Sequence, residues 1–99
     1  MIGVYHILAQ IDYQEKEYLS AVENSKKAIS YEPKEMKKQS EELHLFYAQM
    51  LNVARSVKTL SAEKAEEIRN QAIEEYQYVL KMNPKNATAK KELTQLQGN

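Results

Sequence analysis

Apolar side chains recur every three or four residues along most of this 99-residue chain. Residues at that spacing lie on one face of an α-helix, which buries that face against a neighbour. No stretch shows the sustained alternation of apolar and polar residues that a half-buried strand would need. We therefore predict an all-α fold of about five helices. They are expected at about Ile2–Asp12, Glu17–Tyr31, Met36–Leu60, Ser61–Met82 and 86–97.

The ends of these segments carry helix start and stop residues. Pro33 and Pro84 follow the second and fourth segments, and a proline disfavours helical geometry at the residue before it. Ser61 is suited to be the N-cap of the fourth helix, because its hydroxyl can accept a hydrogen bond from a free backbone N–H group. The connections are short, so consecutive helices should be antiparallel neighbours. We expect a single domain over residues 1–99.

Composition excludes several classes of function. With two glycines and no cysteine, the chain lacks a glycine-rich phosphate loop, disulfides, a thiolate metal site and a cysteine nucleophile. Its 14 basic and 14 acidic residues balance, whereas a nucleic-acid-binding protein normally shows a basic excess. The apolar stretches are only a few residues long, which excludes membrane insertion. The first nine residues lack the features of a signal peptide, so we expect a cytoplasmic protein if the chain is complete.

The sequence also contains an internal repeat. Residues 21–33 can be aligned with residues 72–84, which places Ala21 on Ala72 and Pro33 on Pro84. A second match, further upstream in each copy, aligns residues 8–11 with residues 47–50. Self-similarity of this kind indicates a repeat protein built from helical hairpins.

These segments resemble the tetratricopeptide repeat, a helical hairpin with a small residue in each helix where the two approach and a proline after the second. Tyr5, Leu8 and Ala9 match the aromatic, leucine and small positions of the family's first helix, and the second-helix pattern is matched by Ala21, Ala28 and Pro33. The resemblance implies antiparallel helical hairpins in a right-handed superhelix. It divides the chain into a first repeat at about 2–33, an elongated second repeat at about 35–84 and a capping helix at about 86–97.

The spacing of the small residues departs from the family period of about 34 residues. Ala9 and Ala48 are 39 residues apart, and Ala21 and Ala72 are 51 apart. Because the apolar spacing continues to Leu60, we expect the extra residues after Ala48 to be helical and the second hairpin to project beyond the first. The apolar start of the chain, around residues 2–8, would normally be covered, which favours a fragment of a longer repeat protein over a complete one.

Nothing in the pattern favours catalysis or metal binding. His6 and His44 lack a partner at helical spacing, apart from Glu41, so each is interpreted as a surface or groove histidine. Neighbouring carboxylates in the doublets 41–42, 66–67 and 74–75 point about 100° apart on a helix and are better explained as solvated ion pairs with Lys38, Lys64 and Arg69. The serines have no base within reach. We therefore expect no enzyme, no cofactor and no metal.

The resemblance implies a binding surface instead. In the family, the first helices of successive repeats line a concave groove that holds an extended peptide or a partner helix, and some members clamp a terminal carboxylate there. Only Lys91 fits that clamp, while glutamine and asparagine amides can bond a peptide backbone. We predict a protein–protein interaction module, against the alternative of a polar stripe that is merely solvated. The groove residues would be His6, Gln10, Tyr13, Leu45, Gln49, Asn52, Lys91 and Gln95.

A structural role is the alternative function. The third helix carries a wide apolar stripe between Leu43 and Val57, and the elongated hairpin of the third and fourth helices could mediate self-association, for example as a homodimer. Among the seven tyrosines, Tyr13, Tyr31 and Tyr78 lie off the apolar stripes, and we leave open whether they pack between helices or contact a partner.

Overall fold

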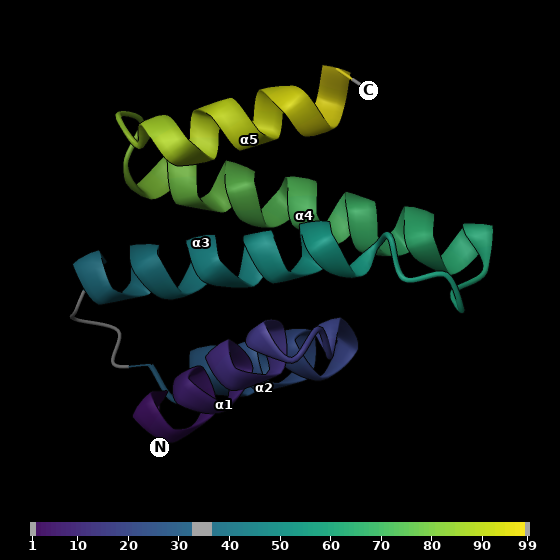
Figure 1. Cartoon of the computed structure of the whole chain (residues 1–99). Coiled ribbons are helices and arrows are strands. Elements are labelled where there is room, and N and C mark those ends of the chain that lie inside the picture. Colours follow the sequence, from purple (N-terminus) through teal and green to yellow (C-terminus); the bar gives the residue numbers. More distant parts are fainter. Residues whose placement is uncertain (1, 33–36, 99) are drawn as a thin grey trace.

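A computed structural model describes residues 2–32 and 37–98, which form five helices and no strand, so the predicted all-α fold is confirmed for this part of the chain (Figure 1). The predicted stop at Pro33 and start at Met36 lie outside the described residues. The helices are α1 (Ile2–Gln14), α2 (Tyr18–Ser30), α3 (Lys37–Ala54), α4 (Ala62–Met82) and α5 (Ala87–Gly98).

Side chains and backbone turns fix the helix ends. The Ser61 hydroxyl accepts a hydrogen bond from the backbone N–H of Lys64 at 3.1 Å, which confirms the predicted N-cap of α4. The Asn86 carboxamide oxygen accepts from the Ala89 N–H at 3.0 Å at the start of α5. After α1, the Glu17 N–H donates to the Asp12 carbonyl and the Lys16 N–H to the Tyr13 carbonyl, and Lys16 has a positive φ of 63°. That pair of bonds is a Schellman turn.

The predicted extension of the third helix to Leu60 is wrong, because α3 ends at Ala54. Beyond it the backbone forms four-residue turns, in which the N–H groups of Ser56, Val57 and Leu60 each donate to the carbonyl three residues earlier. The Ser56 hydroxyl donates to the Val53 carbonyl at 2.7 Å and competes with helix propagation there. Leu60 still packs against the core. The apolar spacing beyond Ala54 therefore indicated which residues are buried, although the backbone there is not helical.

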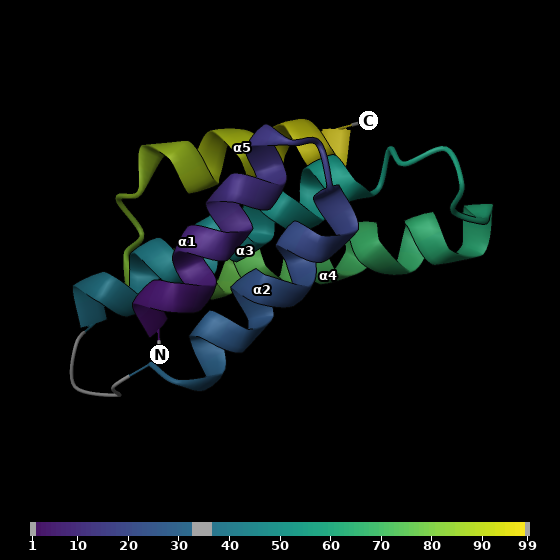
Figure 2. The same cartoon turned by 60° about the horizontal axis from the view of Figure 1, so that its bottom comes forward.

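Consecutive helices pack against one another in chain order. Figure 2 shows α1 and α2 as a hairpin that crosses the longer hairpin of α3 and α4. Figure 1 shows α5 lying along α4. In both views the connection after α3 and the first turns of α4 project beyond the other helices (Figures 1 and 2). The expected projection is therefore present, although turns and α4 supply it and α3 does not.

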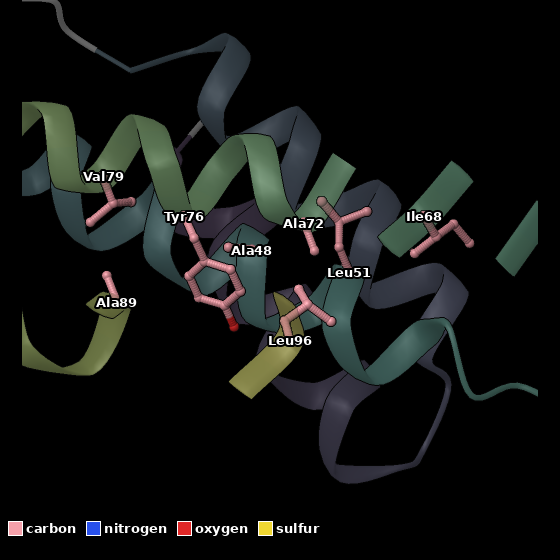
Figure 3. Packing of buried hydrophobic residues seen from close by; sticks show 8 residues of the cluster. All are labelled: Ala48, Leu51, Ile68, Ala72, Tyr76, Val79, Ala89 and Leu96. Atoms are coloured by element: carbon pink, nitrogen blue, oxygen red, sulfur yellow. The ribbon is translucent and has the colours of Figure 1, made fainter. Parts of the chain in front are cut away.

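The core lies between the last three helices. Ala48 and Leu51 of α3 meet the buried residues of α4 and α5, and Figure 3 shows these side chains converging from the three helices. Tyr76, Leu51 and Val79 are the largest side chains that are fully buried among the described residues. The small positions of the aligned repeat are also fully buried, as a close approach of helix backbones would need: Ala9, Ala21, Ala28, Ala48 and Ala72.

The first hairpin buries little apolar surface. Its buried residues are the three alanines and Ser25, whose hydroxyl donates to the Ala21 carbonyl at 2.7 Å. Leu8, which the repeat pattern placed at a leucine position, is 41% exposed. In the described part of the chain, no helix is both long enough and apolar enough to cross a membrane.

Candidate functional site

An open groove of about 380 Å³ lies between the C-terminal end of α1 and the helices α3 and α5. Phe46, Gln49 and Val53 reach it together because residues three or four apart share one face of α3. Glu92 and Gln95 have the same relation on α5. The described residues that line the groove are Tyr13, Phe46, Gln49, Met50, Asn52, Val53, Tyr76, Glu92 and Gln95.

The Glu92 carboxylate is the centre of the groove's hydrogen bonding. Its Oε1 accepts from the Tyr76 hydroxyl at 2.9 Å and from Gln49 Nε2 at 3.1 Å, and its Oε2 lies 3.4 Å from the same Gln49 nitrogen. Burial and the adjacent Glu92 carboxylate raise the pKa of Tyr76 well above its ordinary value of 10.0. Tyr76 is therefore a neutral hydrogen-bond donor at physiological pH, and it holds the carboxylate in place.

Four of the eight residues predicted from the sequence line this groove: Tyr13, Gln49, Asn52 and Gln95. They come from three helices, and only the fold brings them together. Asn52 is held from the side, because Arg55 Nε donates to its Oδ1 at 2.9 Å. Tyr13 is 44% exposed, so its ring is open to a ligand.

The other four predicted residues do not line the groove. Leu45 is half-buried against the core. Its apolar side chain loses more contact with water there than it would in an open groove, which favours the core position. Gln10 and Lys91 are exposed elsewhere. A turn of about 100° per residue directs Glu92, and not its neighbour Lys91, into the groove.

His6 borders a separate hollow of about 160 Å³, together with Gly3, Gln39, Glu42 and Leu43. Its ring packs edge-on against Phe46, with 4.9 Å between ring centroids. Phe46 lines the groove, so His6 supports the groove's aromatic wall from behind it.

Sequence reasoning missed five of the residues that line the groove: Phe46, Met50, Val53, Tyr76 and Glu92. Glu92 left one signal, since it is a charged residue between Ala89 and Leu96 on the apolar face of α5. A charge at such a position needs a polar partner, and Tyr76 and Gln49 supply it here. Gln49 is 43 positions away from Glu92, so no local pattern could reveal the contact.

A second polar cluster surrounds His44, which is 8% exposed and so is not the surface or groove histidine that we expected. Its Nδ1 lies 2.7 Å from Glu75 Oε1 and its Nε2 lies 3.1 Å from Glu32 Oε1. The Tyr78 ring packs against it at 4.6 Å between centroids. The cluster joins the end of α2 to α3 and α4, and Glu41 takes no part in it.

The charge state of His44 follows from these contacts. Burial lowers the pKa of His44, but the hydrogen bonds to Glu75 and Glu32 and their negative charges outweigh it and raise the pKa above 6.5. A carboxylate only accepts hydrogen bonds, so both bonds require the doubly protonated imidazolium. With both nitrogens engaged, His44 ties helices together and is not placed to take a proton from a substrate.

The carboxylates of the other acidic doublets differ in their partners. Glu67–Lys64 is an exposed ion pair at 3.4 Å, as predicted. Glu66 also pairs with Arg69 at 3.4 Å, but Arg69 is half-buried. Glu41 instead accepts from Asn83 and Asn86, which fastens α3 to the connection before α5.

Tyr31 and Tyr78 are 53% and 44% exposed, yet each ring makes a contact within the fold. The Tyr31 ring stacks on Tyr5 at 5.8 Å between centroids, and Tyr78 covers His44. Of the three tyrosines off the apolar stripes, Tyr13 is the one that lines the groove.

Across residues 2–32 and 37–98, no cluster of three or more His, Cys, Asp or Glu side chains could hold a metal ion. Comparisons with protein-family models, with curated proteins and with solved structures find no match to this chain.

Proposed function

We propose that this chain is a tetratricopeptide-like interaction module that binds an extended segment of a partner protein in the groove between α1, α3 and α5. The observation that carries the proposal is the convergence of Tyr13, Gln49, Asn52 and Gln95 on one hollow. In the repeat alignment these residues belong to the first helices of successive units, whose inner faces form the binding surface in the family. The buried alanines at the aligned small positions support the same alignment.

The groove has the size and chemistry for peptide side chains and backbone. Its volume of about 380 Å³ lies at the lower end of the range of ligand pockets. Amide side chains have a donor and an acceptor at one tip, which suits the alternating groups of an extended backbone. Phe46, Met50 and Val53 add apolar surface. We therefore expect this site to bind a segment of a partner protein.

The test is a selection of peptides of about ten residues from a random library on the immobilised chain. The selected peptides are then titrated against a triple variant, Tyr13→Ala, Asn52→Ala and Gln95→Ala. A matched triple variant alters exposed residues of the second helices, Ser20→Ala, Glu74→Ala and Gln77→Ala. We expect the groove variant to lose at least tenfold in affinity and the matched variant to keep it, with both folded by circular dichroism. Equal affinity of the two variants would end the proposal.

Self-association is retained as a second candidate because α1 exposes an apolar face. Val4, Ile7, Leu8 and Ile11 are 41–56% exposed and share one side of the helix. The large apolar residues of α3 between Leu43 and Val53 are buried or half-buried, so α1 is the better surface for a second copy than the α3–α4 hairpin. Sedimentation of the chain and of Ile7→Glu tests this candidate: a dimer that the substitution dissociates supports it, and a monomer at all concentrations removes it.

A further inference from the structure

Glu92 gives the groove a charge that the fold does not neutralise. Among the described residues that line the groove, it alone carries a formal charge. The ion pairs of the described chain involve other carboxylates, those of Glu32, Glu75, Glu66 and Glu67. Arg55 reaches the groove's edge through Asn52 but does not pair with Glu92. Glu92 is therefore a half-buried carboxylate that lines the groove and has no ion-pair partner among the described residues.

The hydrogen bonds of Glu92 orient it and leave room for a further donor. Oε1 accepts from two neutral donors, whereas Oε2 has one long contact at 3.4 Å. A carboxylate has about four acceptor positions, so Oε2 retains acceptor capacity. The carboxylate is already fixed by Tyr76 and Gln49, and a ligand that binds it does not have to order it.

The walls around Glu92 suit the stem of a long basic side chain. Lysine and arginine cover apolar surface with their methylenes while the charged head meets a polar group. Phe46, Met50 and Val53 provide that apolar surface, and the exposed ring of Tyr13 can face a cation. A terminal carboxylate would meet the like charge of Glu92 instead.

From this geometry we propose that the partner segment carries a lysine or arginine whose charged head binds the Glu92 carboxylate in the groove. The inference rests on the proposed function and adds the chemistry of its ligand. A cationic anchor takes the place of the carboxylate clamp for which Lys91 was the candidate, because Lys91 lies outside the groove and the charged residue that lines it is the acidic Glu92.

The test uses the selected peptides in synthetic form, with binding measured by fluorescence anisotropy. We expect one position in them to be occupied by arginine or lysine. Exchange of that residue for neutral citrulline or acetyl-lysine should weaken binding about 10–100-fold, the range expected for a charge-assisted hydrogen bond. Glu92→Gln should bind the charged and neutral peptides equally, and Glu74→Gln, on the exposed side of α4, should retain the wild-type preference. Raising the salt from about 50 to about 500 mM should reduce the preference.

The outcomes separate the two proposals. Peptides that lose affinity for the groove triple variant yet bind equally in charged and neutral form overturn the cationic anchor and leave the groove intact. If the peptides bind the groove triple variant as tightly as the unaltered chain, both proposals are overturned. If Glu92→Gln does not fold, the exchange on the peptide alone decides, because it leaves the protein unchanged.

Discussion

At the scale of single residues, His44 is the clearest case of a side chain whose charge the fold determines. It is held between Glu75 and Glu32, and its raised pKa means that the folded state binds a proton more tightly than the unfolded chain does. Such a group contributes stability that is fully present below the unfolded pKa of 6.5 and is lost as the pH rises through the folded pKa.

We therefore predict that the free energy of unfolding falls as the pH rises from about 6 to about 9. Urea denaturation across this range measures it. His44→Gln should remove most of this slope, since its side chain does not titrate, while His6→Gln should keep it. A wild-type curve that rises over the same range, or one that His44→Gln leaves unchanged, would contradict the assignment.

Lys16 carries the backbone strain of the first hairpin. Its φ of 63° lies in the left-handed region, where a side chain costs about 1–2 kcal/mol and glycine costs nothing. Glycine is the usual residue at this position of a Schellman turn. Glycine relieves this strain but increases the conformational entropy of the unfolded chain, which offsets part of the gain. Lys16→Gly should thus stabilise the protein by a net amount of about 0.5–1 kcal/mol. Lys16→Ala, which keeps the strain, should change thermal stability little, and equal midpoints for the two variants would refute this explanation.

At the scale of the helices, apolar spacing predicted how many elements exist but not where each ends. The starts of α4 and α5 are set by local side-chain caps, and the Ser61 cap could be predicted from the sequence. The end of α3 could not, because Val57 and Leu60 continue the apolar spacing from a series of turns. The site shows the same limit. Of the four amide side chains that the repeat resemblance predicted for the groove, three line it: Gln49, Asn52 and Gln95. The contacts of Glu92 and His44 could not be predicted, because they join residues far apart in sequence.

The packing of α4 makes a direct test of the aligned repeat. Ala72 is fully buried at a small position where α4 meets its neighbours, while Ala62 is exposed in the first turn. Ala72→Leu should destabilise the fold by about 1–3 kcal/mol through overpacking, and Ala62→Leu should have little effect. Thermal unfolding of the two variants compares them under identical conditions. If both are tolerated equally, the helices do not approach at Ala72 as described.

At the scale of the whole molecule, two unequal halves share one groove. The last three helices hold the large buried side chains, whereas the first hairpin is packed through alanines and exposes much of its apolar surface. Tyr13 is the first hairpin's contribution to the groove, and the other lining residues belong to α3, α4 and α5. A ligand in the groove would therefore contact both halves and should hold the first hairpin against the rest.

If a partner segment lies in this groove as we propose, nuclear magnetic resonance of the isotope-labelled chain with a selected peptide should locate it there. A spin label on the peptide broadens resonances close to it. We predict broadening and shifts at Tyr13, Phe46, Asn52 and Gln95, with the exposed residues Ser20 and Gln77 on the second helices unaffected. Broadening confined to α2 and α4, or to the exposed apolar face of α1, would show that the peptide binds outside the groove.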